Sequence, residues 1–206
     1  MDDRVRLAEL VCARLCHDLS GLLGSLIGTL ELLACDGEAT EAVSIAVDTA
    51  AALGRRLKLL RAAWANEAEP LDLPRLASLA EGLANQRIAL DVSALPPTTV
   101  FPPAMGRLVL NLLLLAADSL PRGGLLRLDG NAENLIARLD GPNAAWPPGM
   151  AGMLADEAAA WAGLTEPRSA QAPLTALLAR HDGLHLSLLL ASGPATPAPP
   201  LRLSTI

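Results

Sequence analysis

The sequence has few aromatic residues, few cysteines and no surplus of basic residues. Aromatic side chains make up 2% of the 206 residues and tyrosine is absent, so leucine and alanine must fill the core. The net charge of −6 argues against a nucleic-acid partner, because proteins that bind nucleic acids normally carry a basic patch or stripe. The three cysteines, Cys12, Cys16 and Cys35, do not follow a metal-ligand pattern, and we expect them to be buried free thiols.

Long apolar runs are also missing, although the mean hydropathy of +0.36 is high for a soluble protein. The longest uncharged runs, 19–30 and 108–117, are shorter than the roughly 20 residues that a membrane-spanning helix needs. The first ten residues, MDDRVRLAEL, do not have the basic start and apolar stretch of a signal peptide. We therefore expect a cytoplasmic protein without a membrane partner, whose surplus apolar surface lies in a dimer interface.

Two long amphipathic helices are predicted at the start of the chain. Apolar residues over 3–35 recur every three or four positions, which is the spacing of one helical face, and a second such pattern covers about 41–66. The two helices form an antiparallel hairpin. Because one hairpin buries its apolar face poorly, two copies are expected to form a four-helix bundle. The sequence thus predicts a homodimer formed through residues 1–67.

Shorter helices and strands follow over residues 70–206. The predicted helices cover 72–86, 103–120, 151–162 and 168–181, and the predicted strands cover 87–93, 125–130, 133–140 and 184–190. The proline-rich segment after residue 190 is expected to be a tail without a strand. Helices and strands that alternate loosely, with hairpins, are typical of an α+β sandwich in which helices cover one sheet. We therefore predict two domains, a helical hairpin over 1–67 and an α/β sandwich over 70–206.

His17 is the candidate functional residue of the first helix. It lies about 200° around the helix from the apolar face, with Ala13 one turn before it and Gly21 one turn after it. Gly21 and Gly24 each cost about 1 kcal/mol of helix stability relative to alanine, so some benefit must offset them. They leave the imidazole open to close approach by a globular partner. The adjacent Asp18 can orient the imidazole or accept a proton.

Each of these residues also has a simpler interpretation. A histidine on a helix is often only solvated, and glycines also permit close helix crossing. Arg14 can meet an acidic partner or phosphoryl oxygens, or can be an ordinary solvated arginine. His181 and His185 flank a turn near the C-terminus, and we expect them on the surface or at a sheet edge.

The stretch ARLCHDLSGLLGSLIGTLELL, residues 13–33, resembles the phosphoacceptor helix of histidine kinases. Three further stretches extend the resemblance: RRLKLLRAAW at 55–64, LVLNLLLLAADSLPRGG at 108–124 and LTEPRSAQAPLTALLARHDG at 164–183. The chain as a whole is similar to the ChpT-type histidine phosphotransferases of alphaproteobacteria, in which a dimeric kinase-like hairpin precedes a degenerate kinase-like ATPase domain. This resemblance implies that His17 is the phosphoacceptor and that Asp18 is its orienting or acid–base neighbour.

Residues that a kinase-type ATPase domain needs are missing from the second domain. Such a domain holds magnesium with an asparagine of its helix motif. Asn111 matches the beginning of that motif, but the position four residues later is Leu115, which cannot ligate a hard cation. The candidate adenine loop DGPNA, 140–144, lacks the glycines of D-x-G-x-G, and no P-loop is present. We expect no ATP binding and no cofactor, with Asn111 in a buried core helix.

These observations predict a histidine phosphotransferase that relays a phosphoryl group between receiver-domain aspartates through His17 without ATP. The expected partners are a second copy of the chain, the receiver domain of a hybrid histidine kinase, which would supply the magnesium, and response regulators. One alternative is an ATP-dependent histidine kinase with an unusual nucleotide site. Two others are a non-catalytic dimeric adaptor for receiver domains and a helical scaffold whose glycines serve only packing.

Overall fold

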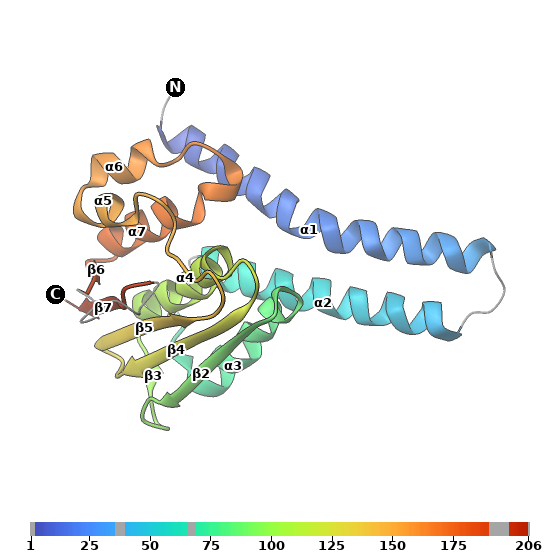
Figure 1. Ribbon diagram of the computed structural model, residues 1–206, viewed down its shortest axis with the longest axis horizontal. Coiled ribbons are helices and arrows are strands. Elements are labelled where there is room, and N and C mark those ends of the chain that lie inside the picture. Colours follow the sequence, from blue (N-terminus) through green and yellow to red (C-terminus); the bar gives the residue numbers. More distant parts are fainter. Residues whose placement is uncertain (1–2, 36–39, 66–68, 190–197, 206) are drawn as a thin grey trace.

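The structure is a computed structural model that describes residues 3–35, 40–65, 69–189 and 198–205. Its first elements are the long helices α1 (Asp3–Cys35) and α2 (Thr40–Trp64). They lie side by side, and their outer ends, residues 23–35 and 40–50, project from the rest of the molecule (Figure 1). We call these outer ends the arm. The predicted helical hairpin is confirmed, with α2 ending slightly earlier than expected.

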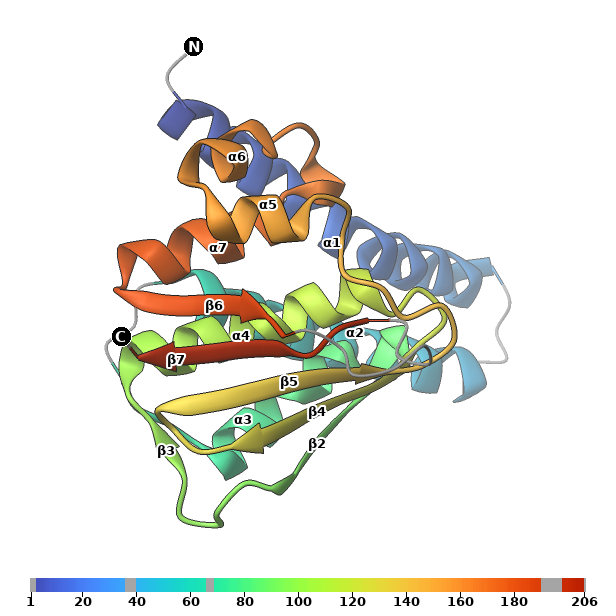
Figure 2. The ribbon, with the colours of Figure 1, turned by 60° about the vertical axis from the view of Figure 1, so that its left-hand side comes forward.

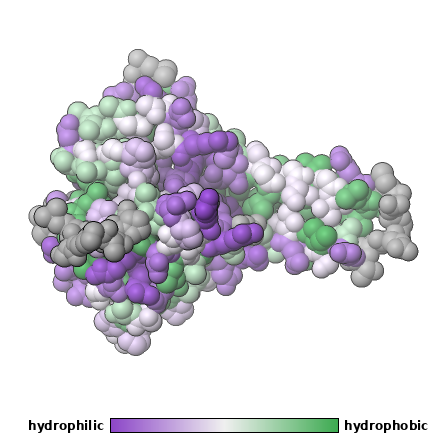
Figure 3. Space-filling view, in the orientation of Figure 1, coloured by the Kyte–Doolittle hydropathy of each residue, from purple (hydrophilic) through white to green (hydrophobic). Residues whose placement is uncertain are grey.

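Much of the apolar surface of the arm faces solvent in the single chain. Figure 3 shows apolar patches along it, and its exposed large apolar side chains are Leu23, Ile27, Leu30, Leu32, Val43, Ile45 and Val47. Two helices alone cannot enclose so many apolar side chains. Exposed apolar surface of this kind is typical of an interaction site.

Helix α1 is long and apolar enough, over Asp3–Leu33, to cross a membrane by length and composition. The expectation that no segment reaches this length was based on uninterrupted apolar runs. The helix as a whole contains some charged residues, but its mean hydropathy is still high enough. Near its middle the helix nevertheless contacts the rest of the chain through polar groups, because Arg14 pairs with Asp118 and Asp18 pairs with Arg56.

A five-stranded mixed sheet dominates the second part of the molecule, in the order β2-β4-β5-β7-β6 (Figure 2). The strands are β2 (Ile88–Ala94), β4 (Gly124–Gly130), β5 (Asn134–Asp140), β6 (Leu184–Leu188) and β7 (Leu201–Thr205). Strands β2 and β4 are parallel, and the other neighbours are antiparallel. Two short strands, β1 (Leu71–Asp72) and β3 (Val100–Phe101), pair separately. Along β4, Leu126 and Leu128 are buried while Arg127 between them is exposed, as the alternation of a strand requires.

Helix α4 (Pro103–Ser119) packs behind this sheet in the view of Figure 2 and forms the centre of the core. It is apolar on nearly all sides, which is typical of a helix buried all round. The remaining helices are α3 (Leu73–Ala80), α5 (Met150–Ala155), α6 (Glu157–Ala162), α7 (Gln171–His181) and the 3-10 helices η1 (Glu81–Gln86) and η2 (Pro167–Ser169). The predicted α+β class, with one sheet covered by helices, is confirmed.

The hydrophobic core extends from the sheet into the base of the hairpin. Leu59, Leu60 and Ala63, near the end of α2, belong to the same buried cluster as Leu112 of α4 and Leu126 of β4. The base of the hairpin is therefore fixed against the sheet, which also fixes the position of α1. The division into domains at residues 67–70 stays a prediction.

The prediction that the proline-rich end of the chain contains no strand is wrong. Residues 201–205 form β7, which lies between β5 and β6 inside the sheet. Leu201 and Leu203 are buried and Arg202 between them is exposed, so this short segment has the alternation of a strand. The prolines that suggested a tail end at residue 200 and leave every backbone N–H of the strand available.

Candidate functional site

His17 lies on α1 with an open surface beside it. Its side chain is 53% exposed, and Ala13, Gly21 and Gly24 are exposed as well. A Cβ atom added at Gly21 or Gly24 would meet nothing within 4 Å. These glycines therefore do not serve close helix packing within the chain, and they leave the approach to the imidazole clear.

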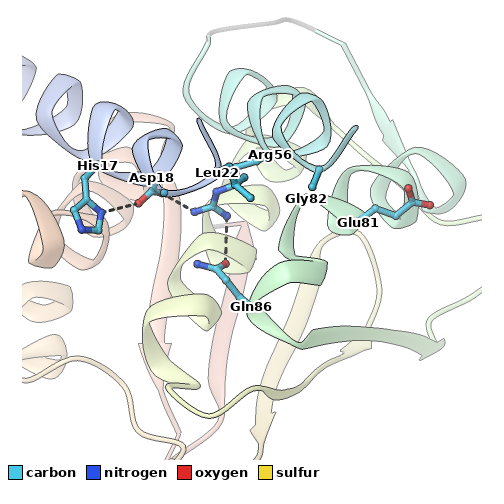
Figure 4. A pocket seen from close by; sticks show the side chains of 9 residues that line it. His17, Asp18, Leu22, Arg56, Glu81, Gly82 and Gln86 are labelled. Atoms are coloured by element: carbon cyan, nitrogen blue, oxygen red, sulfur yellow. Dashed lines mark hydrogen bonds and ion pairs between the residues drawn. The ribbon is translucent and has the colours of Figure 1, made fainter. Parts of the chain in front are cut away.

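Asp18 points away from this open surface, into the contact between α1 and α2 (Figure 4). Its side chain is only 10% exposed, and its Oδ2 accepts a hydrogen bond of 2.6 Å from Arg56 Nη2. Its Oδ1 lies 3.5 Å from His17 Nδ1 and 3.6 Å from Arg14 Nε. Arg56 in turn donates a longer bond, 3.4 Å, to Gln86 Oε1 of η1. Asp18 thus faces the Nδ1 side of the imidazole while two guanidinium groups balance its charge.

Arg14 is 5% exposed and joins α1 to the second part of the molecule. Its two Nη atoms donate to the Asp118 carboxylate at 2.7 and 3.0 Å, and Nη1 also donates to the Arg168 carbonyl oxygen at 2.8 Å. Burial by itself lowers the pKa of Arg14, but Asp118 and Asp18 outweigh it and raise the pKa. Burial raises the pKa of the Asp118 carboxyl, although Arg14 opposes the rise. Arg14 is therefore neither an ordinary solvated arginine nor free to meet a partner, because it is buried and both of its Nη atoms are bound inside the chain.

Arg168 makes a contact with His17 that the sequence did not predict. It lies in η2, 151 residues further along the chain, and its side chain is exposed. Its Nε donates to His17 Nε2 at 3.3 Å. The two ring nitrogens therefore have different neighbours, a carboxylate at Nδ1 and a guanidinium at Nε2. Because Nε2 accepts the bond from Arg168, a neutral imidazole in this arrangement carries its proton on Nδ1 and its lone pair on Nε2.

Two cavities lie near the site: His17 lines one of them, and Arg168, which contacts His17, lines the other. The first, of about 290 Å³, lies between α1, α2 and η1, and its lining includes His17, Asp18, Gly21, Arg56 and Gln86 (Figure 4). The second, of about 440 Å³, lies beside η2 and the end of α4, and its lining includes Asp118, Asn143, Trp146, Glu166 and Arg168. A partner that covers the imidazole therefore finds hollows in both parts of the molecule.

Residues 73–192 match the model of the family described as "Histidine phosphotransferase C-terminal domain". The chain belongs to the histidine phosphotransferase family. The matched residues include β2, β4, β5 and β6 of the sheet, whereas β7 and His17 lie outside them. No curated protein sequence matches the chain.

Two solved structures align with most of the chain. A bacterial phosphotransferase solved at 1.7 Å aligns with 97% of this chain and 95% of its own, at a TM-score of 0.73 and 22% identity. The cytoplasmic segment of the histidine kinase QseC aligns with 80% of this chain and 92% of its own, at a TM-score of 0.38 and 17% identity. The first match shows that the hairpin and the sheet occur together in another protein.

The prediction that Asn111 lies in a buried core helix is confirmed. It is 0% exposed, and its Nδ2 donates to the carbonyl oxygens of Ala63 at 2.8 Å and Arg107 at 2.9 Å. Its Oδ1 accepts a bond of 3.0 Å from Gln171 Nε2. The amide is thus used to join α2, α4 and α7. Within the described ranges, no group of three or more His, Cys, Asp or Glu side chains is arranged to hold a metal ion.

The expectation of buried thiols is wrong for Cys12 and Cys16, which are free and exposed on α1. Cysteine is often buried, but no other described segment of the chain covers these two side chains. The side chain of Cys35 lies outside the described part of the structure. His181 and His185 are exposed, as predicted.

Proposed function

We propose that the chain relays a phosphoryl group between receiver-domain aspartates through phospho-His17, without ATP. The observation that carries the proposal is the half-exposed imidazole of His17, with Asp18 at Nδ1 and open space over Gly21. Membership of the histidine phosphotransferase family supports the reaction type.

The neighbours of the imidazole support attack by Nε2. Because the Asp18 carboxylate faces Nδ1, that nitrogen keeps the ring proton, and Nε2 is the nucleophile. Nε2 attacks the phosphorus of the receiver's aspartyl phosphate in line. The N–P bond forms, the P–O bond breaks, and the leaving carboxylate takes the electron pair. The ring becomes cationic while it carries the phosphoryl group, and Asp18 balances that charge. The reverse reaction passes the group to a second receiver.

The receiver supplies what this site lacks. Phosphoryl transfer depends mainly on positioning and on neutralisation of charge, and the receiver domain brings its own acidic pocket and magnesium. No cofactor is therefore proposed for this chain. The cavity lined by Gly21, Arg56 and Gln86 lies beside the imidazole and offers a docking surface between the hairpin and η1. Ala13 and Gly24 extend the open face of α1. A docked receiver would also contact η1. Receivers that differ in the surface that meets η1 would then bind with different affinities, so this contact would distinguish the receiver of a hybrid kinase from those of response regulators.

The environment of Asn111 supports independence from ATP. Its amide is used by three protein groups in the core, and Leu115, one turn later, is 0% exposed. Neither side chain is available to hold a magnesium–nucleotide complex. Titration calorimetry with magnesium and ATP tests this point, and binding in the micromolar range would favour the ATP-dependent kinase.

The exposed apolar residues of the arm support a homodimer. Packing two arms together gives a four-helix bundle in which Leu23, Ile27 and Val47 are covered. The same packing covers the apolar side of α1, which agrees with a cytoplasmic protein. Sedimentation of the Ile27→Glu variant tests this part: we expect a dimer for the wild type and a monomer for the variant.

Transfer from a phosphorylated receiver domain tests the catalytic part of the proposal. The chain is mixed with the labelled receiver and magnesium, without ATP, beside the His17→Ala variant. The proposal predicts rapid transfer to the wild-type chain only, in an acid-labile and base-stable form. A receiver that binds both proteins and keeps its label with both would favour the adaptor.

A further inference from the structure

Arg168 approaches the imidazole from the second part of the molecule. Its Nε lies 3.3 Å from His17 Nε2, the nitrogen that Asp18 does not face. The contact joins residues 151 positions apart, so it exists only because η2 packs on α1.

The backbone of Arg168 is anchored while its side chain is exposed. Its carbonyl oxygen accepts a bond of 2.8 Å from Arg14, whose other donors bind Asp118. Arg14 lies on α1 three residues before His17, so this bond fixes η2 close to the imidazole. Pro167 begins the 3-10 helix and restricts the backbone just before Arg168. The backbone of Arg168 is thus fixed, while its exposed side chain can still change its rotamer.

The other two arginines near the site are not available for this purpose. Arg14 and Arg56 are 5% and 4% exposed, and their donors face the carboxylates of Asp118 and Asp18. Both arginines therefore neutralise carboxylates of the same chain, and neither is available to an incoming phosphoryl group. The side chain of Arg168 is instead exposed, and it contacts the ring nitrogen that the proposed function uses as the nucleophile.

We propose that Arg168 is a catalytic residue that binds the oxygens of the phosphoryl group on His17 Nε2. This inference rests on the proposed function and deepens it. In the resting protein the Arg168 N–H occupies the Nε2 lone pair. As phosphorus approaches, the guanidinium leaves Nε2 and its N–H groups pair with the phosphoryl oxygens, where a planar fork matches two oxygens. No proton leaves the imidazole in this step. Loss of Arg168 does not free the nitrogen, because water then occupies the exposed lone pair.

Phosphoramidate is the probe that tests this role, because it phosphorylates without docking of a receiver. Its N–P bond breaks, ammonia leaves, and the new N–P bond forms on His17. We expect Arg168→Ala to be labelled at His17 about tenfold more slowly than the wild type, which corresponds to about 1.4 kcal/mol of lost transition-state stabilisation. Arg168→Lys should restore part of the rate, since it keeps the charge but not the fork. Arg122→Ala, which removes an exposed arginine from the turn before β4, is the matched control and should react like the wild type.

The outcomes separate this inference from the relay itself. If Arg168→Ala reacts normally with phosphoramidate but slowly with a phosphorylated receiver, Arg168 is only a docking residue, and the inference is overturned while the relay stands. Failure of phosphoramidate to label the wild-type chain also overturns it. A receiver that keeps its label while phosphoramidate labels His17 refutes the relay, and the phosphoramidate rates alone then decide the role of Arg168. Circular dichroism of each variant checks that the fold is intact.

Discussion

Replacing Arg14 by alanine should destabilise the protein far more than a surface substitution does. The change removes two hydrogen bonds to Asp118, of 2.7 and 3.0 Å, and one of 2.8 Å to the Arg168 carbonyl oxygen. Loss of one partner from a buried ion pair costs about 3–5 kcal/mol. The Asp118 side chain is 24% exposed, so water partly solvates it once Arg14 is gone. We therefore expect a loss of about 2–3 kcal/mol in the free energy of unfolding.

Urea unfolding monitored by circular dichroism measures this loss. Arg6→Ala is the control, because Arg6 is an exposed arginine on the same helix and its removal should change stability by less than about 0.5 kcal/mol. A double-mutant cycle with Asp118→Asn should give a coupling energy of about 1–3 kcal/mol. If Arg14→Ala and Arg6→Ala are equally stable, Arg14 does not join α1 to the second part of the molecule. The placement of Arg168 beside His17 would then have no support either.

Further predictions concern the residues around the imidazole and the pair of Arg14 and Asp118. Asp18→Asn keeps the shape of the side chain but removes the charge beside Nδ1, so transfer from a phosphorylated receiver should slow about tenfold or more; an unchanged rate would show that Asp18 serves only the contact with Arg56. Gly21→Ala should raise the free energy of unfolding by up to about 1 kcal/mol, because its Cβ meets open space. Gly21→Trp should slow transfer from a receiver without loss of stability, and a loss of stability in both Gly21 variants would instead support a packing role. The pKa of Asp118 is raised, so the folded chain holds the carboxyl proton more tightly than the unfolded chain does. The contribution of Asp118 to the free energy of unfolding should therefore fall as the pH rises from about 3.9 through the raised pKa. Urea unfolding at several pH values should show this fall in the wild type, and the fall should be absent in Asp118→Asn.

The helices could be predicted from the sequence because their apolar residues repeat over many turns. Strand β7 could not, since a segment of five residues after a run of prolines is too short for its alternation to outweigh the prolines. The buried helix α4 was predicted correctly because a run of leucines on all sides of a helix is stable only inside a core.

The candidate site was only partly visible in the sequence. The spacing around His17 indicated an open face, because helical geometry alone relates Ala13 and Gly21 to the imidazole. Periodicity does not reveal what packs on a polar face, so the burial of Arg14 against Asp118 was missed. The contact of Arg168 with His17 could not be predicted for the same reason, because it depends on how η2 packs on α1. The sequence offered one indication of Arg168: it is a basic residue in the segment 164–183, which resembles the last helix of the family.

A relay between two receivers tests the central claim most directly. One receiver domain is phosphorylated and labelled, a second unlabelled receiver is added with magnesium, and the label is followed with and without the chain. The account predicts that label reaches the second receiver only when the wild-type chain is present and that a small part is held on His17 as an acid-labile phosphoramidate. Label that moves equally well with the His17→Ala variant, or that never leaves the first receiver, would contradict it.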